Sequence, residues 1–304
     1  MRQKLGKWLF DRESRRILNT PPIRYTPQEG LVIFSMVGKP ALCMYLLAIK
    51  SFLLNFGYGR VEVMSDGSLD EADCNLLRYH IPGISFSHIG EQDTGKCPTG
   101  GTWERLKRAV DLSRESYVIQ LDSDTVAYGP MVDVDRAVSQ NQGFVIGNPR
   151  WQSPVSADSL YHVVKNWDSK HVQPSAELVM KDTGFFRNGE TYLRGCSGFA
   201  GYPRNVANWD DVESASIQFE ERLGLKWHEW GSEQFMTCCL ISKMPGAAVL
   251  PWPLYQNFRF PDVRESMEAS SFIHFIGSHR YERGTYRQLA RRTISRLDSA
   301  KQII

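Results

Sequence analysis

The stretch Tyr117-Val118-Ile119-Gln120-Leu121-Asp122-Ser123-Asp124 decides the fold. A mostly apolar run that ends in two acidic residues is typical of a buried strand whose carboxyl end opens into a site, and open α/β sheets bind their ligands at that edge. Residues i and i+2 of an extended chain point the same way, so Asp122 and Asp124 can converge on one hard cation. The pair suits Mg²⁺ or Mn²⁺ carrying a phosphate better than zinc, which prefers histidine and cysteine.

The composition is that of a soluble globular protein. The chain has 304 residues, 42% hydrophobic and 23% charged, enough for one large α/β domain or two small ones. Its longest apolar stretch, residues 41–56, contains Lys50 and is short for a membrane span, which predicts a buried helix. No secretory signal is visible, and six cysteines lack metal-ligand spacing, so we expect reduced thiols in a cytoplasmic protein.

Basic residues are concentrated at the two ends of the chain. Residues 1–24 and residues 279–304 each contain seven basic and two acidic residues, a formal charge of +5 per end. Because the net charge is +2, the residues between them carry −8. Two ordinary solvated helices explain this pattern, and so does peripheral contact with an anionic inner membrane face. We expect no nucleic-acid partner.

Strand and helix patterns alternate ahead of the acidic strand. This order predicts a mainly parallel, doubly wound sheet, and the absence of GxGxxG and of the Walker lysine disfavours a generic dinucleotide or ATP site. We divide the chain into a basic helical segment (1–26), a catalytic domain (27–283) and a basic C-terminal helix (284–304). The expected strands are 31–37, 61–64 and 84–88, and the expected helices are 70–79 and 102–112.

Several later features each allow two interpretations. Asp66 follows the second strand, where it either contacts a base or ribose or forms an Asp-Gly turn. Residues 140–190 are irregular and aromatic, so the rings either stack on sugars or form a satellite core. Glu233 lies in a first helical turn, which capping alone would explain. His274 lies in a short apolar strand, but the glycine and basic residues after it suit a diphosphate.

Together these stretches resemble the GT-A class of nucleotide-sugar glycosyltransferases, most closely family-8-like enzymes of the glycogenin and bacterial galactosyltransferase kind. The resemblance covers residues 31–286 and implies a Rossmann-like, mostly parallel sheet with helices on both faces and a small acceptor-side subregion. It rests on the DxD motif Leu121-Asp122-Ser123-Asp124, the glycine-containing strand Cys196-Ser197-Gly198-Phe199, the helix start Ser232-Glu233-Gln234 and the His-x-x-Gly motif His274-Phe275-Ile276-Gly277.

The resemblance also implies a donor site around a divalent cation. Asp122, Asp124 and His274 would bind Mn²⁺ or Mg²⁺ at the donor diphosphate, and Arg280 or Lys39 would add positive charge there. We expect a hexose carried by uridine diphosphate. Residues expected to contact this nucleotide sugar are Ser35, Val37, Lys39, Asp66, Arg105, Ser123, Gly277 and Arg280.

Catalytic roles are expected for Asp122, Glu233 and Gln234. In an inverting enzyme, Glu233 would be the general base for the acceptor hydroxyl. In a retaining enzyme, which the His-x-x-Gly ending favours, Gln234 would lie by the anomeric carbon and the diphosphate itself would take the acceptor proton. Glu233 departs from the family pattern, which has aspartate at this position. The acceptor would be a glycan, glycolipid or protein.

Two other functions fit parts of the sequence. Leu121-Asp122-Ser123-Asp124-Thr125-Val126 also matches the motif of haloacid-dehalogenase-like phosphatases, in which Asp122 would be the nucleophile. That family places the motif on its first strand, whereas three strands precede it here. The other alternative is a non-catalytic protein that binds nucleotide sugars, against which the predicted metal ligands and Glu233 argue.

Overall fold

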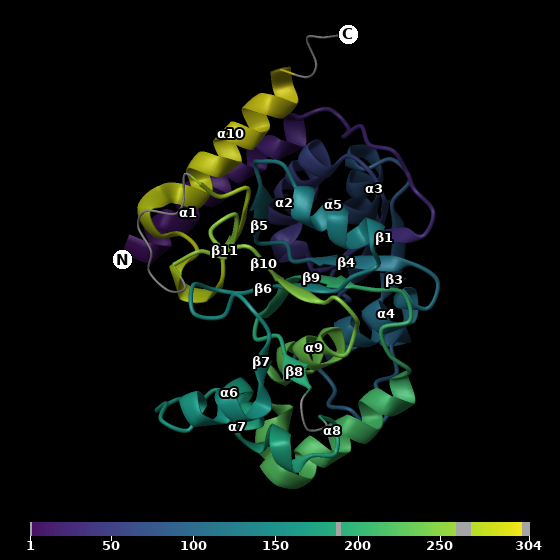
Figure 1. The fold of residues 1–304 in the computed structure, drawn as a ribbon. Helices are drawn as coiled ribbons and strands as arrows, with labels where there is room; N and C mark the ends of the chain where they lie inside the picture. Colours follow the sequence, from purple (N-terminus) through teal and green to yellow (C-terminus); the bar gives the residue numbers. More distant parts are fainter. Residues whose placement is uncertain (1, 187–189, 260–268, 300–304) are drawn as a thin grey trace.

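The computed structural model describes residues 2–186, 190–259 and 269–299. Its centre is a seven-stranded sheet in the order β10-β6-β9-β4-β1-β2-β3 (Figure 1). All pairings are parallel except those that β9 makes with β4 and β6, so the predicted mainly parallel α/β sheet is confirmed. The strands are β1 (Leu31–Val37), β2 (Arg60–Ser65), β3 (Ser85–His88), β4 (Tyr117–Leu121), β6 (Phe144–Ile146), β9 (Cys196–Tyr202) and β10 (Ala248–Leu250).

Helices connect the parallel strands and cover both faces of the sheet (Figure 1). Local chemistry sets where they begin. The side chain of Asp70, for example, accepts the backbone N–H of Asp73 at 2.9 Å in a capping box that starts α3. The helices on the sheet are α2 (Leu42–Phe56), α3 (Glu71–His80), α4 (Trp103–Ser113), α5 (Val132–Ser139) and α9 (Ser232–Ser242). Helix α8 (Trp209–Leu223) packs on α4 and α7 (Val172–Val179).

Alternate residues of the central strands enter two different cores. Leu31 and Ile33 of β1 belong to the core that contains α2 and α5, whereas Val32 and Phe34 belong to the core that contains α4, α8 and α9. Successive side chains of a strand point to opposite faces, which explains this division. Because both faces are covered, ligands can reach the end of β4 only from the edge of the sheet.

Helix α2 is the most apolar helix and lies inside the protein. By length and composition, residues Lys39–Phe56 could cross a membrane, contrary to our expectation that the stretch is too short. Core helices meet the same criteria, and ten residues of α2, including Lys50, are buried. The Lys50 ammonium donates to Thr20 Oγ1 at 2.7 Å and to the Pro21 carbonyl at 2.6 Å, which compensates its burial. The predicted buried helix is confirmed.

The chain passes from β4 of the main sheet into β5, which belongs to a smaller, three-stranded sheet. Its strand β12 pairs with β5 in antiparallel fashion, which sets His274 opposite Thr125. On its other side β12 pairs with β11 in parallel, which sets Asn257 beside His274. Residues far apart in the sequence therefore meet at the end of β4. The strands are β5 (Thr125–Ala127), β11 (Tyr255–Asn257) and β12 (Phe272–His274).

The prediction that residues 140–190 are irregular is wrong. This region forms the small subregion at the bottom of Figure 1, and its helices were missed because each has only eight residues, too few to show a clear apolar period. Residues 187–189 lie outside the described part. Besides β6, the region contains β7 (Val155–Ser156), α6 (Ala157–Val164), α7 (Val172–Val179) and η4 (Met180–Asp182), and β8 (Thr191–Tyr192) follows it.

The two ends of the chain form a helix pair. Helix α1 and helix α10 pack on each other and on α2, at the upper left of Figure 1. Met1 and residues 300–304, which belong to the two expected terminal segments, lie outside the described part. The terminal helices are α1 (Arg2–Ser14), η1 (Arg15–Asn19) and α10 (Thr285–Ser299).

Candidate active site

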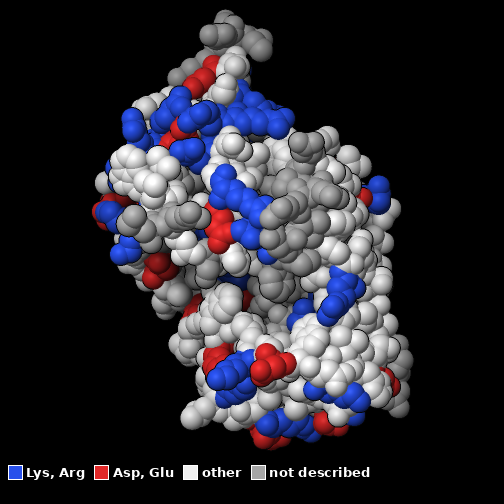
Figure 2. All heavy atoms as spheres, turned by 90° about the vertical axis from the view of Figure 1, so that its left-hand side faces the viewer, with Lys and Arg blue, Asp and Glu red and all other residues white. Residues whose placement is uncertain are grey.

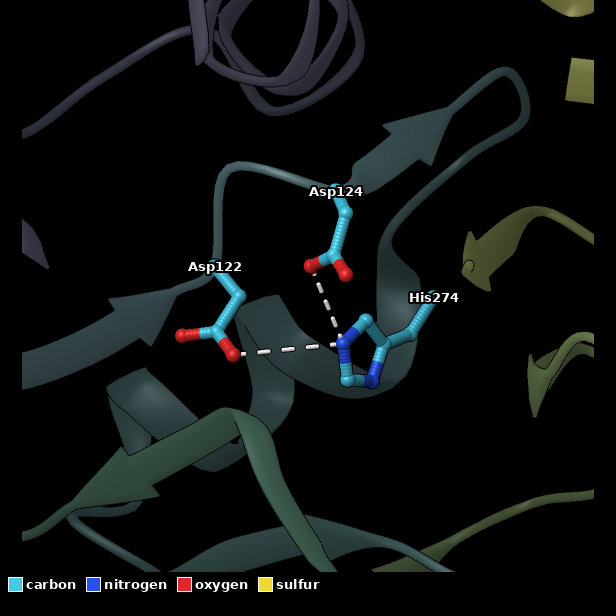
Figure 3. Close-up of side chains that lie close together, drawn as sticks. All are labelled: Asp122, Asp124 and His274. Carbon is cyan, nitrogen blue, oxygen red and sulfur yellow. Dashed lines mark hydrogen bonds and ion pairs between the residues drawn. The ribbon is translucent and has the colours of Figure 1, made fainter. Parts of the chain in front are cut away.

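Two aspartates and a histidine meet where β4 passes into β5 (Figure 3). Each of Asp122, Asp124 and His274 offers one ligand atom, and these atoms all lie within 4.8 Å of one another. Nε2 of His274 lies 3.1 Å from Asp124 Oδ1 and 3.9 Å from Asp122 Oδ2. The structure thus brings together the three residues that were predicted from the sequence to bind a metal ion.

Backbone contacts fix this cluster. The Asp122 N–H donates to the Gly198 carbonyl of β9 at 2.9 Å, and the Phe275 N–H donates to the Asp124 carbonyl at 2.7 Å. A Cβ added at Gly198 would overlap the ring of His274, so this close approach requires glycine. The glycine of the β9 motif therefore makes room for the histidine.

The imidazole of His274 is oriented from its far side. Its Nδ1 lies 3.0 Å from Asn257 Oδ1 and 3.5 Å from Cys196 Sγ. An amide oxygen can only accept a hydrogen bond, so Nδ1 of His274 carries the hydrogen and donates it to Asn257 Oδ1. This arrangement directs Nε2 toward the two aspartates, as metal-binding histidines are commonly oriented.

Opposite charges compensate the burial of the cluster. Burial favours the neutral forms, yet the charges of His274 and Arg280 hold the pKa of Asp124 below its ordinary value. Asp124 in turn raises the pKa of His274, against the effect of burial. Arg280 donates to Asp124 Oδ2 at 2.5 Å. Nearby positive charge favours the charged form of a carboxyl group, which is the form that binds a metal ion.

Arg105 connects Asp122 to Glu233. Its guanidinium donates to Asp122, to Glu233 Oε2 at 3.0 Å and to Ser197 Oγ at 3.2 Å. Only 7% of the Arg105 side chain and 2% of the Glu233 side chain are exposed. Burial raises the pKa of Asp122, and the charge of Arg105 opposes this effect.

The carboxylate of Glu233 is occupied by donors. In addition to Arg105, its Oε2 accepts from Thr102 Oγ1 at 2.9 Å and from Ser197 Oγ at 3.3 Å. Its Oε1 accepts from Thr237 Oγ1 at 2.8 Å. Four donors surround this one carboxylate, so its lone pairs are already engaged by protein groups. This geometry suits a residue that positions Arg105.

The side chain of Gln234 is held from two sides. Its Oε1 accepts the Ser197 N–H at 3.4 Å, and its Nε2 donates to Gln173 Oε1 at 2.7 Å. Gln173 is itself anchored, because its Nε2 donates to the hydroxyl of Tyr192 at 3.3 Å. Because Gln173 fixes the Nε2 group, the orientation of the Gln234 amide is set. Its Oε1 accepts one hydrogen bond from the Ser197 N–H and keeps a second lone pair that could accept another.

A cavity of about 910 Å³ joins these groups to an aromatic region. At its far end, the indole rings of Trp151 and Trp167 lie 6.3 Å apart, and Arg194 lies over Trp167 at 4.9 Å. His171 and Trp230 form a second pair 5.7 Å apart, and Trp230 is 69% exposed. Aromatic faces at a cavity of this size are suited to sugar rings.

The aromatic residues of the subregion form a core, and two of their rings also line the cavity. Trp151 and Phe186 belong to the hydrophobic core that contains α9, Trp167 packs against it, and Trp151 and Trp167 line the cavity. The wall also contains Arg194, which pairs with the fully buried Glu177 at 2.9 Å. Burial raises the pKa of Glu177 to about 7, although Arg194 opposes this effect.

The residues expected to contact donor and acceptor fall into two groups. Those lining the cavity are Arg105, Asp122, Asp124, Glu233, Gln234, His274, Gly277 and Arg280. Those outside its lining are Ser35, Val37, Lys39, Asp66 and Ser123.

The second group has partners within the protein. Ser35 donates to the Leu121 carbonyl at 2.7 Å inside the sheet, and Lys39 pairs with Asp70 at 2.5 Å. Asp66 accepts from the Ser68 N–H at 2.9 Å, as in the turn considered above. Val37 ends β1, Asp66 follows β2 and Asp122 follows β4. These strands are parallel neighbours, so the three residues lie at the same carboxyl edge of the sheet.

Sequence reasoning missed Asn257, Gln173 and Arg194. Asn257 lies in a three-residue strand, and its role depends on pairing with β12. Gln173 and Arg194 lie in and after the region that looked irregular. The sequence held no signal for Asn257 or Gln173, whereas Arg194 directly precedes the glycine-rich strand and could have been suspected.

No protein-family model and no curated protein matches the sequence. The structure is similar to the galactosyltransferase LgtC, solved in complex with donor and acceptor sugar analogs, at 12% identity and a TM-score of 0.53 over 88% of this chain and 95% of that one. It is also similar to the bifunctional glycosyltransferase WbbM at 13% identity and a TM-score of 0.50, over 84% of this chain. The chain spans about half of WbbM, 47% of its length. These likenesses establish a GT-A fold.

Proposed function

We propose that this protein is a metal-dependent glycosyltransferase that uses a nucleotide sugar. The observation that carries the proposal is the cluster of Asp122, Asp124 and His274 at the carboxyl edge of the GT-A sheet, on the wall of a cavity large enough for two sugars. The fold alone would not carry it, because one fold can host many functions.

The donor set fits a divalent cation. Two carboxylates and one imidazole suit Mn²⁺ or Mg²⁺, and Asn257 orients the imidazole as metal sites require. A cation held by Asp122, Asp124 and His274 would supply Lewis-acid stabilisation to a departing diphosphate. Arg280 lies beside Asp124 and would add its positive charge to that diphosphate. Gly277, whose φ is +54°, lets the backbone turn between His274 and Arg280.

The nucleotide would extend along the sheet edge toward β1 and β2. Val37 and Asp66 close these two strands, and uridine diphosphate is the nucleotide we propose. Asp66 would accept a hydrogen bond from a base or ribose with the oxygen that Ser68 leaves available. The hexose would then lie between Asp122 and Gln234, inside the cavity.

The hydrogen bonds of Glu233 and Gln234 support retention. Glu233 is occupied by four donors, so it positions Arg105 and, through it, Asp122. Gln234 lines the cavity, and its oriented oxygen would lie by the anomeric carbon. In this reaction the bond from that carbon to the diphosphate oxygen breaks, a bond to the acceptor oxygen forms on the same face, and the acceptor proton passes to the diphosphate.

The acceptor would be a glycan or the sugar part of a glycolipid. Trp151, Trp167 and Trp230 offer apolar faces of the kind that cover the C–H side of a sugar ring. Arg194 and His171 offer polar atoms between these faces. This combination of ring faces and polar side chains fits a saccharide.

The phosphatase alternative is not supported by the contacts of its nucleophile. Asp122 pairs with Arg105, which is also held by Glu233, and this pairing weakens a carboxylate as a nucleophile. The motif also follows the fourth strand of the chain, not the first.

The test is release of nucleotide from a panel of nucleotide sugars with Mn²⁺ and candidate saccharide acceptors, with proton NMR of the product anomer. We expect a UDP-hexose to be consumed with retention and the Asp124→Asn variant to be inactive, while Asp133→Asn on α5 stays active. Metal-dependent hydrolysis of an aryl phosphate without any sugar transfer would contradict the proposal. Tight binding of a nucleotide sugar without turnover would instead support a non-catalytic binding protein.

A further inference from the structure

The helix pair at the chain ends carries a concentrated positive charge. Lysine and arginine side chains cover the upper part of the face in Figure 2, where α1 and α10 lie in Figure 1. Each terminal segment has a formal charge of +5, while the rest of the chain carries −8. Helix α1 itself contains four basic and two acidic residues and α10 four basic and one acidic, so the two helices together carry a formal charge of +5.

Helix α1 has an outward face on which apolar and basic side chains alternate. Lys4, Leu5, Trp8 and Arg12 lie within about 100° of one another on a helix of 3.6 residues per turn. Leu5 is 57% exposed and Trp8 is 56% exposed, and the Arg12 guanidinium lies 5.9 Å from the Trp8 ring. We call these four residues the α1 face. The opposite side of the helix packs inward through Phe10, which is 2% exposed.

Acidic residues do not neutralise the α1 face. Asp11 pairs with Lys7 at 2.5 Å. Glu13 is buried and accepts from Arg16 at 2.5 Å and from Arg291 of α10 at 2.9 Å. Glu13 is thus used inside the helix pair, and Asp11 is used in a partly exposed pair with Lys7 of α1 itself, so both acids have partners other than Lys4 and Arg12.

The pair is fixed to the catalytic body. The ring of Phe10 stacks on Tyr286 at 4.0 Å, and Tyr286 stacks on Phe275 at 4.1 Å. Phe275 follows His274 directly, so a continuous aromatic stack runs from α1 to the predicted metal site. A surface that docks through α1 would hold the cavity in a set orientation.

We propose that the α1 face, flanked by the arginines of α10, docks on an anionic lipid bilayer. Exposed leucine and tryptophan among basic residues are what an interfacial helix presents, because the apolar groups enter the boundary region while the cations meet lipid phosphates. A nucleic acid would be bound by the cations alone, with no need for Leu5. The contact is peripheral, since α2 is buried within the protein. It does not depend on the proposed transfer reaction.

Sedimentation of the full chain with vesicles tests this inference. We expect binding to phosphatidylcholine vesicles that contain phosphatidylglycerol, little binding to phosphatidylcholine alone, and release at high salt. Lys4→Gln with Arg12→Gln should weaken partitioning about fivefold per charge, equivalent to about 1 kcal/mol for each cation at a bilayer surface. Leu5→Gln with Trp8→Gln should weaken it without changing the charge.

The control removes two lysines outside the helix pair, Lys96→Gln with Lys165→Gln, and should bind as the unchanged protein does. Thermal unfolding of every variant verifies that α1 still packs. Equal vesicle binding by all variants would overturn the proposal, as would no binding by the unchanged protein. Binding to single-stranded RNA that competes fully with vesicles and ignores Leu5 and Trp8 would assign the surface to a polyanion, which also overturns it.

Discussion

At the metal end of the cavity the side chains hold one another, whereas at the aromatic end they face the space a ligand would fill. Asp124 contacts both His274 and Arg280. Trp230, at the other end, is 69% exposed and contacts mainly His171. The contrast indicates a preorganised donor site and a more permissive acceptor site.

The two ends also differ in their scaffold. The metal end is formed by strands of the two larger sheets. The pairing of these strands determines which residues lie opposite one another. The aromatic end is formed by short helices and by connections around β7 and β8. Variation in short elements costs little stability, so this half is where related chains would differ in acceptor.

The largest effect is expected from Asp124→Asn. Wild-type protein with Mn²⁺ and UDP at about 100 times its dissociation constant should gain roughly 2.7 kcal/mol of stability. The variant should lose this gain entirely, because one of the predicted ligands becomes a neutral amide. Differential scanning fluorimetry with and without metal measures it, and Asp133→Asn is the control. An undiminished thermal shift in Asp124→Asn would mean that Asp124 does not bind the metal ion.

A smaller loss is expected from Asn257→Ala. Without the amide oxygen, the ring of His274 is no longer oriented, and comparable changes around metal sites weaken affinity by about 10–100-fold. Titration calorimetry with Mn²⁺ in the presence of UDP measures the change, and Asn75→Ala on the exposed side of α3 should leave the affinity unaltered. Equal affinities for both variants would show that Asn257 does not orient a metal ligand.

Trp230→Ala should affect the aromatic end alone. Covering about 60 Å² of indole at about 25 cal/mol per Å² is worth about 1.5 kcal/mol, so KM for the saccharide acceptor should rise about tenfold. Binding of UDP and Mn²⁺ should stay as in the wild type. Trp8→Ala, which removes another exposed indole outside the cavity, is the matched control for steady-state kinetics. A change in UDP binding would mean that the two ends are not separable.

The smallest effect concerns Glu177 behind the aromatic wall. Its pKa is raised to about 7 by burial, so the folded protein holds a proton there that the unfolded chain releases near pH 4.5. Stability from this group is therefore present at low pH and falls as the pH rises through 7, by about 1 kcal/mol between pH 6 and pH 8. Urea denaturation should show a flatter pH dependence for Glu177→Gln. An unchanged pH dependence between pH 6 and pH 8 would mean that Arg194 keeps Glu177 ionised.

The sequence predicts the metal end better than the aromatic end for a physical reason. Asp122 and Asp124 adjoin a strongly hydrophobic strand, so local pattern alone places them at the sheet edge. His274 came from a motif, but the partner that orients it, Asn257, is defined only by strand pairing. Glu233 shows a further limit, because its first-turn position is compatible with capping or catalysis. Only the fold reveals the four donors around it.

The most direct test of the central claim is anomalous diffraction from crystals grown with MnCl₂ and UDP. We predict one strong manganese peak bound by Asp122, Asp124 and His274, with the diphosphate of UDP on the same ion and Arg280 turned toward it. A manganese peak elsewhere, or UDP bound in this cavity with the three side chains contacting only each other, would contradict the account.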